Sequence, residues 1–168
     1  MSVFQLTDAS YPFDWIKSNN VRMIWETIEK DFSIFFSNYT LKNQSENFIN
    51  FDNPSYKSKI QIKLDNGIVL PHEAIDTFFD YNVYKEKYER RILRFKTVIR
   101  DKNIKKIFIR ADEKKITEEN KHMLINSLNK YGCLNYEIKF INYSEYICKE
   151  NFTWKRDYID WKNIFLNL

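Results

Sequence analysis

The sequence predicts a single α/β domain spanning residues 1–168, with a mixed, mainly parallel sheet, helices on both faces and one β-hairpin. Three observations favour this class. One segment alternates strictly between polar and apolar residues before a tight turn, and a second shows clear helical spacing. A third has the order strand, helix, strand, which is typical of parallel pairing in α/β folds.

The hairpin is predicted from Lys59–Leu64, which alternates as a half-buried strand does. Asp65-Asn66-Gly67 supplies a tight turn, and Ile68–Leu70 can pair back. The polar stretch before it, Leu41–Ser58, is predicted to be a surface loop.

Two helices are predicted before and after the hairpin. Asn20 can cap a helix over Val21–Lys30, and the apolar group Phe32–Phe36 continues it after a bend. The clearest amphipathic helix is expected over Val83–Arg100, where one face carries Tyr84, Tyr88, Ile92, Phe95 and Ile99.

The strand–helix–strand unit begins with Ile104–Ile109, a short strand expected to be buried on both faces. A helix starts at Thr117 and ends before Gly132, and Tyr136–Ile141 is the next strand. The two strands should be parallel neighbours joined by a right-handed crossover. Trp154–Leu168 is amphipathic and is expected to be a closing helix.

Composition narrows the class of protein. With 43% hydrophobic and 17% aromatic residues, the chain has ample material for a core, so disorder over most of its length is not expected. It shows neither a signal-peptide pattern nor an apolar run of about 18 residues, so the cytoplasm is the expected location. Two cysteines, Cys133 and Cys148, are too few for a disulfide framework.

The basic residues concentrate in one stretch. Between Lys85 and Arg110 there are eleven Lys/Arg and three acidic residues, whereas the whole chain has a net charge of +4. Such a stretch can bind nucleic acid or another anionic ligand. The alternative is a solvated helix face followed by strand flanks.

Two short motifs differ in composition from simple packing elements: Ser10–Trp15, which reads Ser-Tyr-Pro-Phe-Asp-Trp, and Tyr88–Phe95, which reads Tyr-Glu-Arg-Arg-Ile-Leu-Arg-Phe. Pro71-His72 lies between them, and a strand ending in arginine, Ile107–Arg110, follows. With these motifs in this order, the chain resembles the family of putative papain-like cysteine peptidases over roughly Val3–Asn142.

The resemblance implies a cysteine nucleophile, a histidine base and a polar residue that orients the histidine. His72 would be the base and Asp14 the orienting carboxylate. Members of the family begin with a strand that ends in a Ser-Leu-Gly-x-x-Cys-type segment, and only Met1–Val3 precede Phe4 here. The resemblance therefore implies a shortened and inactive member, or a fragment whose upstream residues would restore the enzyme.

The two cysteines present are expected to pack rather than to act as substitutes for that nucleophile. Cys133 follows a predicted helix end, and Cys148 lies in an irregular stretch. His72 and Asp76 could share one helix face, but two ligands without a third are weak support for a metal site. No metal and no cofactor are expected.

The ligand-binding residues predicted from these motifs are arginines. Three of them, Arg90, Arg91 and Arg94, lie on one flank of the predicted helix and can clamp a carboxylate or phosphate, and Arg110 ends the next strand. An acidic peptide or another anion is the expected ligand. Asp14, His72 and at least one of the three helical arginines should converge on one cleft. The alternative for Asp14 is that it fixes a turn after Pro12, and for the arginines that they pair with internal acids.

A shortened sheet has a further consequence. Without the family's first strand, one parallel strand should have an exposed edge, unless the hairpin or a second copy of the chain covers it. Formation of a homodimer through this edge is therefore a prediction.

Overall fold

The computed structural model describes residues 10–14, 16, 18, 20–43, 60–70, 79–112 and 115–142. Its elements follow in the order α1 (Arg22–Glu29), the 3₁₀ helix η1 (Ser33–Phe36), β1 (Tyr39–Asn43), β2 (Ile60–Leu64), β3 (Val69–Leu70), α2 (Tyr81–Arg100), β4 (Lys106–Asp112), α3 (Glu118–Lys130) and β5 (Tyr136–Asn142). The predicted α/β class is confirmed. The expected closing helix at residues 154–168 lies outside the described residues.

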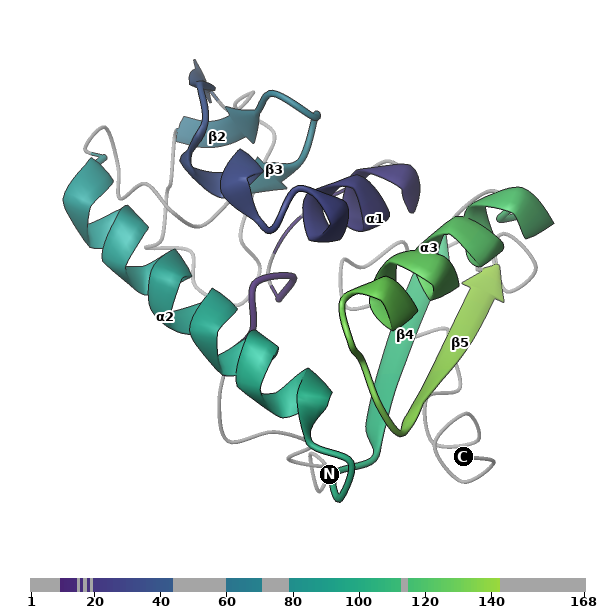
Figure 1. The fold of residues 1–168 in the computed structure, drawn as a ribbon. Helices are drawn as coiled ribbons and strands as arrows, with labels where there is room; N and C mark the ends of the chain where they lie inside the picture. The colour runs from purple at the N-terminus through teal and green to yellow at the C-terminus, as the bar shows by residue number, and fades with distance from the viewer. Residues whose placement is uncertain are drawn as a thin grey trace, which may run out of the picture.

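The described strands form two small sheets instead of one mainly parallel sheet. Strands β1, β2 and β3 form an antiparallel sheet in that order, and β4 pairs with β5 in parallel. Figure 1 shows α3 lying across β4 and β5, with α1 beside α3. Helix α3 joins β4 to β5, which is the kind of connection that a parallel pair needs.

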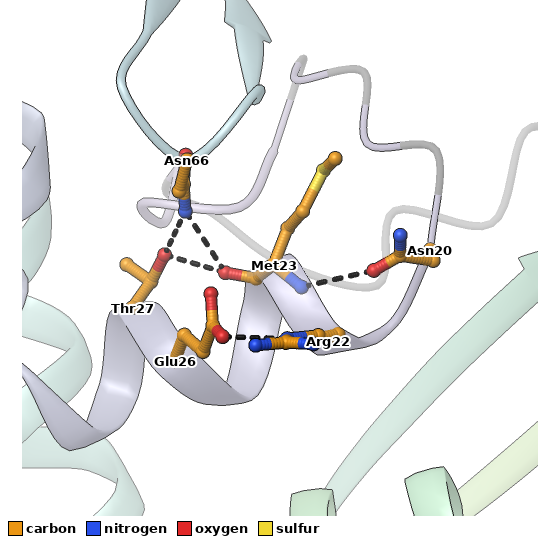
Figure 2. Close-up of polar contacts among 6 residues, drawn as sticks. All are labelled: Asn20, Arg22, Met23, Glu26, Thr27 and Asn66. Atoms are coloured by element: carbon orange, nitrogen blue, oxygen red, sulfur yellow. Dashed lines mark hydrogen bonds and ion pairs between the residues drawn. The ribbon is translucent and has the colours of Figure 1, made fainter.

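The predicted hairpin is confirmed, and its turn is fastened to α1. Asn66 donates from Nδ2 to the Met23 carbonyl at 3.2 Å and to Thr27 Oγ1 at 3.0 Å, and its Oδ1 accepts from the Ile68 amide at 3.1 Å. Figure 2 shows this side chain pointing from the turn onto the helix. Gly67 adopts φ +90°, a conformation that suits glycine.

The start of α1 agrees with the sequence to within one residue. Asn20 Oδ1 accepts a hydrogen bond from the Met23 amide at 3.2 Å (Figure 2), but the N-cap residue is Val21, so the helix begins one residue later than predicted. After α1 the chain bends sharply, since Asp31 and Phe32 have φ values of 50° and 63°. The apolar group then forms η1, which confirms the predicted bend.

The loop prediction for residues 41–58 is wrong at its start, because Leu41–Asn43 belongs to β1. Tyr39 lies opposite Leu64 and Leu41 opposite Ile62. The strand therefore forms because an apolar partner strand is present, although its own sequence is mostly polar. The remainder of this predicted loop lies outside the described residues.

Helix α2 begins two residues earlier than predicted, because Asp80 caps it. The Asp80 Oδ1 atom accepts from the amides of Asn82 at 2.8 Å and Val83 at 3.2 Å. All five apolar residues of the predicted stripe are buried. They pack against the aromatic centre of the core, where Phe32 and Phe35 have no exposed surface.

The parallel unit of β4, α3 and β5 is confirmed, with Lys106 opposite Tyr136 and Asp112 opposite Asn142. Thr117 caps α3 by accepting from the Asn120 amide at 3.3 Å. The expectation that the first strand is buried on both faces is wrong, because 41% of Ile107 is exposed. None of the helices in the described ranges is long and apolar enough to cross a membrane.

Candidate functional site

A cavity of about 650 Å³ lies between described N-terminal residues, helices α1, α2 and α3, and strands β4 and β5. Its walls are mostly apolar, and its polar side chains are few. The described residues that line it are Tyr11, Phe13, Asp14, Ile16, Ser18, Val21, Ile24, Ile28, Phe95, Val98, Ile99, Ile104, Lys105, Lys106, Ile107, Phe108, Ile109, Arg110, Leu124, Leu128 and Ile138. A concave, largely apolar site with a few polar groups is the usual form of a ligand site.

The first motif forms one wall of this cavity through a tight turn. The Tyr11 amide donates to Asp14 Oδ2 at 2.7 Å, and the Asp14 amide donates to the Tyr11 carbonyl at 3.2 Å. Phe13 anchors the turn in the core, with its ring centre 5.9 Å from that of Phe95. Asp14 thus fixes a turn, which is one alternative predicted for it, and it also lines the cavity. Its role beside His72 stays a prediction.

The two motifs meet in space although they are far apart in sequence. Arg94 Nη1 donates to the Ser10 carbonyl at 2.6 Å. This charge-assisted bond holds the N-terminal turn against α2. Arg94 therefore serves an internal contact that shapes the cavity wall.

The other helical arginines take different positions. Arg91 is buried, with 8% of its surface exposed, and its guanidinium carbon lies 5.2 Å from the centre of the Tyr88 ring. Arg90 is exposed on α2. Neither belongs to the described lining of this cavity.

Arg110 is the predicted ligand-binding arginine that does line the cavity. Its guanidinium pairs with the Asp112 carboxylate, with Nε 2.7 Å from Oδ2. It also donates to Ser18 Oγ at 2.5 Å and to the Ser18 carbonyl at 3.2 Å. The side chain fastens the end of the N-terminal wall to β4.

Sequence reasoning missed Lys106, Ser18 and Asp112 as parts of this site. Lys106 is 7% exposed and donates to the Asp101 carbonyl at 2.6 Å. Arg110 and Asp112 are two residues apart on one strand, so their side chains share a face, and this spacing is a signal that was available. For Ser18 no sequence signal existed, since its role depends on the tertiary approach of β4.

His72 lies outside the described residues, so the predicted convergence of Asp14, His72 and an arginine stays a prediction. Cys148 lies outside them as well. His122, on α3, is exposed, and the residues described contain no cluster of three or more metal-binding side chains.

Cys133 is buried, with 5% of its surface exposed, and does not belong to the described lining of the cavity. Burial raises the pKa of its thiol, and the nearby Lys106 ammonium opposes this shift only in part. A raised pKa keeps the sulfur protonated near neutral pH, where a nucleophile needs a thiolate. The packing role predicted for this cysteine agrees with its position.

Much of the basic stretch has partners within the chain. Lys96 pairs with Asp31 at 2.8 Å, Lys105 with Glu137 at 3.1 Å, and Lys85 with Glu89 at 3.8 Å. The guanidinium of Arg100 lies over the Tyr131 ring at 5.4 Å. These contacts engage part of the basic stretch within the chain, and binding of an anion by residues 85–110 stays a prediction.

The structure therefore defines an α/β protein with a largely apolar cavity that is bordered by the parallel strand β4. Residues 1–146 match the family described as "Putative papain-like cysteine peptidase", and the chain belongs to that family. An uncharacterized protein of Acanthamoeba polyphaga mimivirus is 30% identical over 205 residues, which cover 96% of this chain and 89% of the viral protein. No solved structure matches the chain.

Proposed function

We propose that this protein is a member of the papain-like cysteine peptidase family that binds a ligand in the cavity without using a cysteine nucleophile. The observation that carries the proposal is the position of Cys133: it is buried, its thiol pKa is raised, and it does not belong to the described lining of the cavity. Cysteine peptidases need an accessible thiolate beside a histidine base. Cys148 lies outside the described residues, so the proposal that it is not a nucleophile rests on the sequence alone.

The polar groups of the cavity support binding better than catalysis. Asp14 accepts from the Tyr11 amide in a local turn, and Arg110 is engaged with Ser18 and Asp112. Side chains committed to such contacts give a wall a fixed shape. A preformed, apolar cavity with a fixed wall suits recognition of a ligand.

The proposal retains His72 as a residue that could face this ligand, as the family resemblance suggests. The second candidate, nucleic-acid binding by residues 85–110, has less support. The internal partners of Lys96, Lys105 and Arg100 reduce the charge available to phosphates.

The test is thiol reactivity together with peptide hydrolysis. The full chain, Cys133→Ser, Cys148→Ser and His72→Ala are incubated at pH 7 with fluorescein iodoacetamide and with a fluorogenic peptide mixture, beside papain as a positive control. We expect Cys133 to react at least about 100-fold more slowly in the native protein than in guanidinium, because its thiol is buried. We expect no hydrolysis above the buffer rate.

Two results would refute the proposal. One is peptide hydrolysis that is abolished by Cys133→Ser or by Cys148→Ser and is also abolished by His72→Ala. Loss of activity in both kinds of variant defines a thiol–imidazole pair. The other is a native cysteine that reacts faster than free cysteine at pH 7 and slows when His72 is replaced.

A further inference from the structure

Two exposed apolar side chains lie on neighbouring connections at one end of the molecule. Ile104, between α2 and β4, is 43% exposed, and Leu134, between α3 and β5, is 48% exposed. The Leu134 amide donates to the Ile99 carbonyl at 2.9 Å, which joins the two connections. Figure 1 shows the end of α2 and the starts of β4 and β5 at this end of the molecule.

Hydrogen bonds hold both connections in place. Asn135 donates from Nδ2 to the Lys102 carbonyl at 3.1 Å and accepts at its own carbonyl from the Lys106 amide at 2.9 Å. Within the first connection, Asp101 Oδ1 accepts from the Asn103 amide at 2.8 Å. Single exposed apolar residues are common on proteins, but neighbouring ones that are held in place indicate an interaction surface.

The same surface is basic. Arg100, Lys102 and Lys105 are exposed on the first connection. Asp101 is the acid between them, and residues 131–135 carry no charge, so three cations and one acid give the two connections a net charge of +2. Among the residues described, Lys102 takes part in no ion pair, whereas Lys105 pairs with Glu137 at 3.1 Å. Apolar side chains and uncompensated positive charge therefore occur together.

We propose that this end of the molecule docks on an anionic lipid bilayer, with Ile104 and Leu134 entering the headgroup region and the cations contacting the lipid headgroups. A bilayer offers negative charge above an apolar layer, so it matches both parts of the surface. Nucleic acid would match the cations but would leave the two aliphatic side chains in water, since bases stack on aromatic or guanidinium planes. The inference goes beyond the proposed function, because Leu134 and Lys102 do not belong to the described lining of the cavity.

The binding expected from these groups is weak and reversible. Each net positive charge near an anionic surface strengthens binding about fivefold. Burial of the exposed part of each apolar side chain adds roughly threefold to tenfold. We therefore expect half of the protein to be bound at lipid concentrations on the order of 1 mM, which is the marginal affinity of a peripheral contact.

The first test is sedimentation of the full chain with vesicles. One set contains phosphatidylcholine with about 30% phosphatidylserine, and the other contains phosphatidylcholine alone. At about 0.1 M salt we expect the first set to bind at least about tenfold more tightly than the second, and at about 0.5 M salt we expect most of this difference to disappear. Equal binding to both sets would overturn the inference, and so would the absence of binding at about 10 mM anionic lipid.

Matched variants locate the contact. Leu134→Asn and Lys102→Gln should each weaken binding to the anionic vesicles at least about threefold. The controls lie on α2: Leu93→Asn changes an apolar side chain that is 67% exposed, and Lys85→Gln changes an exposed cation in the first half of the helix. Both controls should bind within about 1.5-fold of the native protein. Controls that weaken binding as much as the other two variants would contradict the docking surface.

The second test needs no substitution. Methyl-labelled native protein is mixed with anionic vesicles that contain a nitroxide-labelled lipid, and methyl signals are followed by NMR. We expect the signals of Ile104 and Leu134 to lose at least about three times as much intensity as those of Leu93 and Val83, which are 67% and 62% exposed on α2. Equal losses, or larger losses on α2, would overturn the inference.

A fluorescein-labelled single-stranded DNA of about 20 nucleotides, titrated by fluorescence anisotropy, tests the other anionic partner. We expect it to bind no more tightly than about 100 μM at about 0.1 M salt. Binding tighter than about 10 μM that Lys102→Gln weakens, together with vesicle binding that Leu134→Asn leaves unchanged, would assign the cations to nucleic acid and overturn the inference.

Discussion

Arg110 provides the sharpest test of how the cavity wall is held. Replacing it by methionine removes two hydrogen bonds to Ser18, of 2.5 Å and 3.2 Å, together with the pair to Asp112. Hydrogen bonds to charged groups contribute about 1.5–3 kcal/mol each, and Arg110 and Asp112 are 17% and 12% exposed, so solvent screens them only in part. We apply the lower end of that range to the two hydrogen bonds to Ser18. Arg110→Met is therefore expected to lower the free energy of unfolding by roughly 3 kcal/mol.

Domains of this size are stable by about 5–15 kcal/mol, so the variant should remain folded, with a Tm lowered by about 6–12 °C. The assay is urea unfolding followed by tryptophan fluorescence. Lys105→Met is the matched control, because Lys105 pairs with Glu137 on the surface at 3.1 Å. Its cost should be at most about 1 kcal/mol.

A double-mutant cycle isolates the contact with Ser18. Ser18→Ala should cost about 1.5 kcal/mol in the native background and almost nothing beside Arg110→Met, since its partner is then absent. The coupling should therefore be near 1.5 kcal/mol. If Ser18→Ala costs the same in both backgrounds, the hydrogen bonds to Arg110 do not hold this wall.

Two further predictions concern the core and the charge network. Tyr84→Phe should cost about 1–2 kcal/mol in urea unfolding, because it leaves the buried Phe35 carbonyl without its 2.6 Å donor, and a cost below about 0.3 kcal/mol would contradict this. The pKa of Asp31 is lowered by hydrogen bonds from Lys96 and Tyr131, so its stabilisation is present above the unfolded pKa of about 3.9 and is lost as the pH falls through the folded value. The Asp31→Asn variant should therefore lose less stability than the native protein when the pH falls from 7 to 3. Equal decreases in the urea midpoint of the two proteins would contradict the stabilising role assigned to the Asp31 carboxylate.

The elements predicted correctly are those whose signal is local. The Asp65-Asn66-Gly67 turn places a glycine at φ +90°, and the strands on either side pair as the alternation required. The apolar stripe of α2 follows from its helical period, and its five residues are buried. In each case the residues that determine the structure are neighbours in the sequence.

The errors concern contacts between distant segments. Strand β1 forms because Tyr39 and Leu41 meet Leu64 and Ile62, although polar residues surround them in the sequence. Arg110 likewise donates to Ser18, a partner far away in the sequence. A residue type alone does not reveal such a partner.

The candidate site was predicted in the same uneven way. Asp14 and Arg110 stood out in the sequence, and both line the cavity. Arg91 and Arg94 stood out equally, yet Arg91 is buried over Tyr88 and Arg94 bonds to the Ser10 carbonyl. A functional motif and a structural motif look alike in sequence when both need a guanidinium with an exact partner.

Two of the family-matching arginines make contacts within the chain that do not depend on a nucleophile. Arg94 holds Ser10 against α2, and Arg110 holds Ser18 against β4. Both anchors act on the N-terminal wall of the cavity. Cleavage would require in addition a thiolate placed in that cavity, and burial of Cys133 disfavours ionisation of its thiol. The wall and the nucleophile are therefore separable physical requirements.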